Sequence, residues 1–295
     1  MKKWSATGNP TGRIAYVNGR YLPHALAGVH IEDRALQLGD GIYEVTNVIA
    51  GKPIDEEPHL DRMERSLREL GMAMPMGRAA LKLVMREMIA RNRVANGLLY
   101  LQVTRGAARR DHVPPKNPPR PTLILTMRAQ DMTALAARME KGIAVSTQPD
   151  IRWGRCDIKT VQLLPNLLAK QAAKQAGAFE AWLVDDDGYV TEGGSTNAWI
   201  VNGEGDVITR DLSHAILPGV TRRIMLDAMR DAQVKVVERK FTVAEALAAR
   251  EAFISSATGA AIPVVTIDGK RIGDGQPGPV TRRIRDLYAE KAGIK

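Results

Sequence analysis

The chain has 295 residues, of which 44% are hydrophobic and 25% charged, so it is long enough to bury the cores of two modest domains. Its formal charge is +9, but basic and acidic residues alternate as on solvated helix faces, which argues against a nucleic-acid-binding protein and favours carboxylate metabolites as partners. A single cysteine excludes an internal disulfide, and the lack of a signal-like run or an apolar run of about 20 residues leads us to expect a cytoplasmic protein with no membrane partner.

The first part of the chain alternates strand and helix patterns. Strand patterns cover residues 14–21, 40–49, 98–104 and 122–127, and apolar residues at helical spacing cover 59–71 and 77–92. The pair Asn18-Gly19 is a hairpin signal. A proline-rich loop separates the last two strands, and a polar stretch at 128–133 reads as a linker. We therefore expect a smaller N-terminal α/β domain over residues 1–130.

The second part of the chain mixes short strands with helices. The patterns predict a strand at 142–147, helices at 161–176, 220–232 and 281–291, and a hairpin at 265–272. Thr242 and Glu245 form the capping-box pattern of a further helix. Strands and helices do not alternate strictly, which favours the α+β class over a doubly wound sheet. We expect a larger C-terminal domain over residues 131–295.

Two segments of this second part carry candidate catalytic residues. Residues 150–159, Asp-Ile-Arg-Trp-Gly-Arg-Cys-Asp-Ile-Lys, end on Lys159, a lone lysine between apolar neighbours. Residues 190–199 contain Glu192 before a Gly-Gly-Ser turn, 33 positions later (192 minus 159). A catalytic amine must be partly desolvated to be nucleophilic near pH 7, and a carboxylate can keep a bound pyridine nitrogen protonated. Taken alone, each residue is more often an ordinary surface or turn residue.

Three further segments could contact a phosphate group. The sequence Leu-Pro-Gly-Val-Thr at 217–221 opens a helix, where Val220 and Thr221 would offer main-chain amides and Thr221 its hydroxyl. Arg62 lies in a predicted helix, and a turn of small residues occupies 255–259. Each of these also fits a plain structural role. The sequence has no glycine-rich nucleotide loop and no Gly-x-Ser-x-Gly nucleophile turn. It also lacks the residue spacing of a metal site, so we expect no metal.

Taken together, these motifs resemble those of the fold-type IV aminotransferases, a family that uses pyridoxal 5′-phosphate. The resemblance extends from about residue 16 to residue 287. It includes Glu-Asp-Arg at 32–34, Leu-Gly-Asp-Gly-Ile-Tyr-Glu-Val at 38–45, His-Leu-Asp-Arg at 59–62, Leu-Gln-Val-Thr-Arg-Gly at 101–106 and Leu-Ala-Lys-Gln at 168–171. It implies a homodimer of two-domain α+β subunits, with the cofactor at the interface of the domains.

The resemblance also implies a role for each matched residue. Lys159 would bind the cofactor covalently, Glu192 would hold its pyridine nitrogen, and Leu217 would pack against its ring. The phosphate ligands would be Arg62, Val220, Thr221, Ser256 and Thr258. Two places depart from the family pattern. Ala257 stands where relatives carry a phosphate-binding threonine, and Thr258 could replace that contact; Gly259-Ala260-Ala261 replaces an acidic pattern seen in relatives.

The loop after Val-Thr-Arg-Gly distinguishes branches of this family. D-amino acid-specific members carry an Arg-x-His motif there, and this chain has Arg110-Asp111-His112. Together with Tyr43, these residues match a trap for the substrate α-carboxylate, in which Arg110 and His112 come from the partner subunit. A guanidinium binds a carboxylate in a bidentate manner, which fixes one end of the amino acid. The resemblance therefore implies a D-amino acid transaminase that converts D-alanine and 2-oxoglutarate to pyruvate and D-glutamate.

Two alternatives on the same fold stay open. A branched-chain L-amino acid aminotransferase or an aminodeoxychorismate lyase-like enzyme would keep the cofactor residues but lack the trap at Tyr43, Arg110 and His112. A third alternative, a basic nucleic-acid-binding protein without catalysis, is disfavoured because the positive charge is spread along the whole chain.

Overall fold

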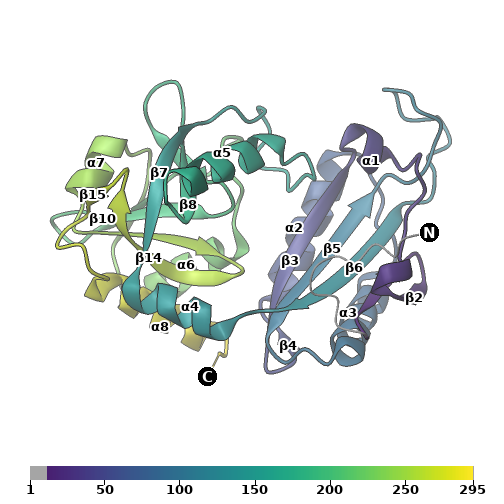
Figure 1. Ribbon diagram of the computed structural model, residues 1–295, viewed down its shortest axis with the longest axis horizontal. Coiled ribbons are helices and arrows are strands. Elements are labelled where there is room, and N and C mark those ends of the chain that lie inside the picture. Colours follow the sequence, from purple (N-terminus) through teal and green to yellow (C-terminus); the bar gives the residue numbers. More distant parts are fainter. Residues whose placement is uncertain (1–11, 295) are drawn as a thin grey trace. The chain divides into compact units, whose positions relative to one another are not determined.

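The computed structural model of the chain describes residues 12–294. The chain divides into two compact units, each combining helices with a β-sheet, as predicted for an α+β protein (Figure 1). The first unit extends to Gln130 and also contains Ile158–Gln162, whereas the second comprises Asp131–Asp157 and Leu163–Lys295. The predicted domains, 1–130 and 131–295, are separated by one boundary, so they do not include the return of Ile158–Gln162 to the first unit.

The first unit is built on a six-stranded sheet in the order β2-β1-β6-β5-β3-β4. Neighbouring strands are antiparallel throughout. The strands are β1 (Ile14–Val17), β2 (Arg20–Pro23), β3 (Gly41–Ile49), β4 (Lys52–Pro53), β5 (Gly97–Thr104) and β6 (Thr122–Ala129). The helices are the 3-10 helix η1 (His24–Leu26), α1 (Arg34–Leu38), α2 (Glu56–Glu69) and α3 (Arg78–Asn92).

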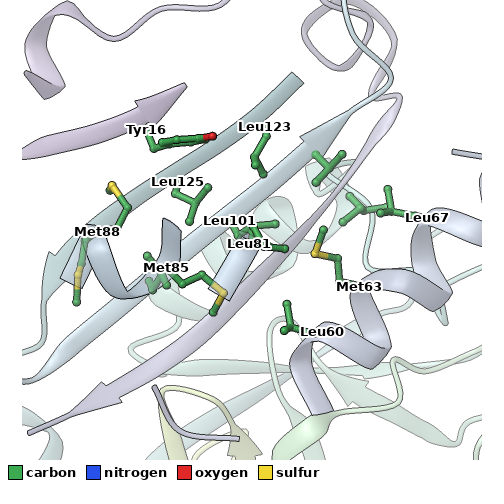
Figure 2. Packing of buried hydrophobic residues seen from close by; sticks show 14 of the residues in the cluster. Tyr16, Leu60, Met63, Leu67, Leu81, Met85, Met88, Leu101, Leu123 and Leu125 are labelled. Atoms are coloured by element: carbon green, nitrogen blue, oxygen red, sulfur yellow. The ribbon is translucent and has the colours of Figure 1, made fainter. Parts of the chain in front are cut away.

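Helices α2 and α3 form the core of the first unit together with the sheet. Each helix buries apolar residues spaced three or four apart, which form one face. Figure 2 shows this packing, with Leu60, Met63 and Leu67 from α2, Leu81, Met85 and Met88 from α3, and Tyr16, Leu101, Leu123 and Leu125 from the sheet. Burial of each such side chain stabilises the fold by about 1.5–3 kcal/mol, so the position of α2 on the sheet is firmly set.

The second unit is built on a nine-stranded sheet in the order β12-β11-β10-β13-β14-β7-β8-β9, with β15 paired to β14. Its strands are β7 (Ile143–Pro149), β8 (Glu180–Val184), β9 (Val190–Gly193), β10 (Asn197–Val201), β11 (Val207–Thr209), β12 (Val236–Glu238), β13 (Glu251–Ser256), β14 (Gly259–Ile267) and β15 (Lys270–Arg271). Its helices are α4 (Met132–Lys141), α5 (Leu164–Gln175), α6 (Val220–Asp231), α7 (Val243–Ala248) and α8 (Pro279–Lys291). Large buried side chains from the sheet, such as Trp182 and Trp199, fill its cores.

The structure confirms the turn and cap predicted from local sequence. Asn18 and Gly19 have positive φ angles of 47° and 91° between β1 and β2, as a tight hairpin turn requires. Thr242 and Glu245 exchange the two hydrogen bonds of a capping box at the start of α7. These features depend on neighbouring residues alone, which is why the sequence predicts them.

The expected linker at 128–133 is wrong in its extent. Strand β6 continues to Ala129, and α4 begins at Met132, with the Asp131 side chain accepting a hydrogen bond from an amide of its first turn. The connection is therefore shorter than the polar composition indicates. The five-residue helix α1 also escapes prediction, because it is too short to show a helical repeat.

Candidate active site

Lys159 lies in the segment that returns to the first unit. Ile158, just before it, is 4% exposed and belongs to the core of that unit. The segment pairs with the start of β3: the Tyr43 amide donates to the Lys159 carbonyl at 2.9 Å, and the Val161 amide donates to the Gly41 carbonyl at 3.1 Å. Anchored in this way, the half-buried Lys159 places its Nζ 4.2 Å from the centroid of the Tyr43 ring. The amine is therefore partly shielded from water and held against an aromatic face.

Tyr43 is itself held by a second aromatic ring. It lies on β3, and its ring stacks on that of Tyr100 on β5, with centroids 5.7 Å apart and an interplanar angle of 23°. The Tyr100 hydroxyl donates to Gln102 Oε1 at 2.7 Å, and burial raises the pKa of Tyr100 to about 12, so its phenol stays protonated. The stack fixes the Tyr43 ring beside Lys159.

Arg62 is held on α2 by a buried carboxylate from β3. Its Nε and Nη2 donate to the two oxygens of Glu44, each at 2.8 Å, and Nδ1 of His59 lies 2.8 Å from the same carboxylate. Burial alone would raise the pKa of Glu44, but the Arg62 guanidinium and His59 together hold it well below its usual value. Glu44 is therefore ionised, and its bidentate pairing sets the orientation of the Arg62 guanidinium.

Glu192 lies near the end of β9 in the second unit and is 6% exposed. Its carboxylate accepts hydrogen bonds from the Arg152 guanidinium, from Asn197 Nδ2 at 3.1 Å and from the Leu217 amide at 3.1 Å. Burial raises the pKa of the Glu192 carboxyl, while Arg152 acts in the opposite direction. Three donors thus converge on one buried carboxylate.

A row of alternating charges continues from Glu192 into the second unit. The side chain of Arg152 is 6% exposed and pairs with both oxygens of Asp150, at 2.8 Å and 2.7 Å. Thr191 donates its hydroxyl to Asp150 at 2.6 Å, and Arg152 also donates to the Ala215 carbonyl at 3.0 Å. Two carboxylates and one guanidinium leave this buried row with a net negative charge. A cation beside Glu192 would neutralise it, and the row therefore favours a protonated nitrogen there.

Asn197 connects Glu192 to the turn before α6. Its Nδ2 donates to both Glu192 and the Leu217 carbonyl, each at 3.1 Å. Gly219 lies so close to Asn197 that an added Cβ would stand 2.1 Å from its Oδ1, so a side chain at Gly219 would displace the amide. Because glycine has no side chain, the start of α6 can lie next to Asn197 and the Glu192 network.

The N-terminus of α6 carries Val220 and Thr221, which are both buried. The first amides of a helix have no partner inside the helix, and they favour an anion. The Thr221 hydroxyl is buried and has no hydrogen-bond partner within residues 12–294. In the turn between β13 and β14, the hydroxyls of Ser256 and Thr258 lie 2.9 Å apart. Within residues 12–294, Thr221 thus offers a buried hydroxyl without a partner beside the first amides of the helix.

The predicted α-carboxylate residues differ in burial. Tyr43 is half-buried, whereas Arg110 and His112 are exposed on the loop between β5 and β6. Within the described part of the chain, neither of these two side chains has a hydrogen bond or an ion pair. The main chain of the loop is nevertheless fixed, because Arg34 donates to the carbonyls of Asp111 and His112.

Other kinds of site find little support. Residues 12–294 contain no group of three or more His, Cys, Asp or Glu side chains placed to hold a metal ion. Burial raises the pKa of the Cys156 thiol to about 11, so it is not a thiolate near neutral pH. In the same range of residues, no helix has the length and apolar character needed to span a bilayer.

Comparison with known proteins identifies the family of the chain. The family model "Amino-transferase class IV" matches residues 41–267, which is most of the chain. The chain belongs to the class IV aminotransferases. This aminotransferase is 37% identical over 273 residues to a D-alanine aminotransferase of Staphylococcus epidermidis, covering 92% of this chain and 95% of that protein. It is 38% identical over 272 residues to a D-alanine aminotransferase of Bacillus licheniformis, covering 91% and 93% of the two chains.

The fold of this aminotransferase is also that of a solved relative. The crystal structure of the Escherichia coli branched-chain amino acid aminotransferase superposes with a TM-score of 0.87 at 22% identity, and covers 97% of this chain and 96% of its own. At that identity the likeness concerns the fold alone. The predicted membership of the family and the predicted two-domain α+β fold are thus confirmed.

Several residues of the aminotransferase network were missed at the level of sequence. Asp150 and Arg152 stand in the segment that ends on Lys159, and Asn197 follows the Gly-Gly-Ser turn, but no role was predicted for them. Their spacing relative to Glu192 has no fixed signature, because Arg152 reaches it across 40 positions of sequence. The sequence signal for Asp150 and Arg152 is an Asp-x-Arg pattern before a lone lysine. This pattern by itself is common in loops.

Proposed function

We propose that this aminotransferase is a D-amino acid transaminase that uses pyridoxal 5′-phosphate to transfer the amino group of D-alanine to 2-oxoglutarate. The observation that carries the chemistry is the buried Glu192 carboxylate, backed by the Asp150–Arg152 pair. The two D-alanine aminotransferases at 37% and 38% identity support the choice of substrate. We propose that the protein acts in the cytoplasm. Its proposed partners are small carboxylates, not nucleic acid or a membrane.

The residues present fit the proposed cofactor. Glu192 would hold the pyridine nitrogen, because a ring cation neutralises the negative row that it shares with Arg152 and Asp150. The unpartnered Thr221 hydroxyl and the α6 amides would bind the phosphate, with Leu217 against the ring. The remaining proposed phosphate ligands are Arg62, Ser256 and Thr258. When bound, the cofactor supplies an electron-withdrawing ring that stabilises negative charge at the substrate α-carbon.

The protein side chains then have separate tasks. Lys159 would hold the cofactor covalently and, once released from it, would accept the proton from the substrate α-carbon and return it. Tyr43 keeps one side of the Lys159 amine shielded from water. Tyr43, Arg110 and His112 would bind the α-carboxylate and so decide which enantiomer presents its α-hydrogen to Lys159.

Thr221 gives a test of the cofactor site that does not depend on turnover. Thr221→Val should weaken pyridoxal 5′-phosphate binding at least about tenfold, since a hydrogen bond to a charged group such as the phosphate contributes about 1.5–3 kcal/mol. The cofactor-free protein should keep its melting temperature or gain slightly, because a buried hydroxyl without a partner has been removed. Equilibrium titration and thermal melting measure the two effects.

Thr209 is the matched control for this substitution. It is equally buried, but its hydroxyl donates to the Ala198 carbonyl at 2.9 Å. Thr209→Val should therefore lower the melting temperature of the cofactor-free protein and leave the cofactor Kd unchanged. A Thr221→Val protein that loses stability without losing cofactor affinity would show that Thr221 is a structural residue only.

We further propose that the active unit is a homodimer in which Arg110 and His112 serve the site of the partner subunit. Large apolar side chains are exposed on the first unit around this loop: Leu36 on α1 is 66% exposed, and Val113 on the loop is 71% exposed. Such residues would become buried in a subunit contact. The exposed position of both Arg110 and His112 also suits side chains that act across such a contact.

Hybrid dimers test this arrangement. Lys159→Ala and Arg110→Ala proteins, dissociated together and reassociated, should form heterodimers with one fully intact site. Activity with D-alanine should then exceed the mean of the two parent homodimers several-fold. Heterodimers isolated by two affinity tags and no more active than that mean would place Arg110 in its own subunit's site.

The whole proposal is tested by the absorption spectrum of the purified holoenzyme. Adding D-alanine should bleach the visible band of the lysine-bound cofactor, whereas L-alanine, L-leucine and L-valine should leave it nearly unchanged on the same timescale. Bleaching by the branched L-amino acids alone would favour the branched-chain alternative, which shares this fold. A protein with no visible band after incubation with pyridoxal 5′-phosphate would overturn the cofactor assignment.

A further inference from the structure

The loop that carries Arg110 and His112 has almost no core of its own. Between β5 and β6 the chain forms no helix or strand beyond an isolated bridge from Ala107 to Asp33, and most of its side chains are exposed. Its base is closed at Gly106, which has a φ of +99° and lies so close to Arg120 that an added Cβ would stand 2.2 Å from the Arg120 carbonyl oxygen. Closure at the base alone leaves the middle of such a loop free to vary.

One buried guanidinium holds the middle of this loop. Arg34, at the start of α1, is only 3% exposed. Its Nη1 donates to the Asp111 carbonyl at 2.7 Å and its Nη2 to the His112 carbonyl at 3.3 Å. The Arg34 amide donates to the Gly106 carbonyl at 3.0 Å, so the same residue also contacts the base of the loop. Both carbonyls adjoin the residues of the proposed carboxylate trap.

Asp40 completes the support on the other edge of Arg34. Its Oδ2 accepts from Arg34 Nε at 2.8 Å and from Arg105 Nε at 2.7 Å. Arg105 in turn donates to the Leu70 carbonyl at 2.8 Å, just after α2. Asp40 thus shares its negative charge between two guanidinium groups of the first unit, and it holds the Arg34 fork toward the loop.

We propose that Arg34 is a positioning residue for substrate recognition, which sets the Arg110–His112 segment by binding its main chain and does not touch the substrate itself. The inference rests on the proposed function for the role of that segment. It follows from donor geometry: arginine can bind Asp40 with one edge and two carbonyls with its other nitrogens. A lysine ammonium is a compact point charge that lacks this planar fork of donors.

The test is Arg34→Lys in the holoenzyme, with Arg128→Lys on the exposed end of β6 as the matched control. We expect KM for both D-alanine and 2-oxoglutarate to rise about tenfold, because each carries an α-carboxylate, while kcat changes much less. The visible cofactor band should stay unchanged. In an Arg110→Ala background, Arg34→Lys should add little, because both substitutions impair the same contact.

Limited digestion with trypsin gives a second readout that needs no substrate. Arg109, Arg110 and Lys116 are exposed cleavage positions in this loop. Release of the Asp111 and His112 carbonyls should increase cleavage at these positions several-fold in Arg34→Lys and not in Arg128→Lys. If Arg34→Lys fails to bind cofactor or to fold, Asp40→Asn replaces it, since it weakens the same support while keeping the side-chain shape.

The outcomes separate this inference from the proposed function. Unchanged KM and unchanged cleavage in the folded variant would overturn the positioning role, even if Arg110→Ala strongly reduces turnover of D-alanine. Faster cleavage with unchanged KM would overturn it as well, because the loop would be released without any effect on recognition. If Arg110→Ala leaves turnover of D-alanine intact, the proposed trap itself is wrong and Arg34 has no substrate-related role.

Discussion

Lys159→Ala should reduce turnover of D-alanine by at least about 10⁴-fold, because general acid–base catalysis alone contributes up to about that factor and the covalent attachment is lost as well. The purified variant should lack the visible band of the lysine-bound cofactor. It should still fold, since the main-chain pairing of this segment with β3 does not use the lysine side chain. Steady-state rates, absorption spectra and thermal melting provide the three measurements.

Lys174 is a suitable control because it is an exposed lysine on α5. Lys174→Ala should retain the spectrum and the rate of the unmodified enzyme. Mass spectrometry after borohydride reduction should find the cofactor on the peptide that contains Lys159 and on no other. A Lys159→Ala enzyme that keeps more than a few per cent of the rate would show that another amine performs the chemistry.

The position of Lys159 illustrates how far sequence reasoning reaches. The sequence marks Lys159 only as a lone lysine between apolar neighbours, whereas the structure attaches its segment to β3 through Tyr43 and Gly41, more than 100 positions earlier in the chain. A pairing of this kind depends on which strand edge is left open, and local sequence does not contain that information. Helices α2, α3 and α6 were predictable because each buries one face of a regular repeat.

The surroundings of the candidate site were the least predictable part. Glu192 could be selected from a motif, but its partners Arg152, Asn197 and the Leu217 amide are brought to it by tertiary structure. The contacts of Arg34 were equally unpredictable, because it donates to main-chain carbonyls, which no side-chain motif specifies. Sequence thus selects candidates for contact with a cofactor or substrate better than it selects the residues that hold these candidates in place.

Arg110→Ala should lower kcat/KM for D-alanine and D-glutamate about 30- to 150-fold. The reason is the loss of one charge-assisted partner of the α-carboxylate, which contributes about 2–3 kcal/mol. The resting spectrum should be unchanged, because Arg110 is proposed to contact the substrate α-carboxylate and none of the groups proposed to hold the cofactor. The ratio of D- to L-alanine rates should also fall, since the group proposed to fix the orientation of the substrate is gone.

Lys116→Ala separates this specific contact from a general effect of charge. Lys116 is an exposed cation of the same loop, so its removal takes away one positive charge, as Arg110→Ala does. We expect a change of less than about twofold, which weakens further at high salt because exposed charges are screened. Equal losses in the two variants would reduce the role of Arg110 to long-range attraction. If the unmodified enzyme prefers L-leucine or L-valine over every D-amino acid, the proposed trap is wrong and the branched-chain alternative is favoured. The reason is that an α-carboxylate bound in the proposed orientation presents the D-enantiomer's α-hydrogen to Lys159.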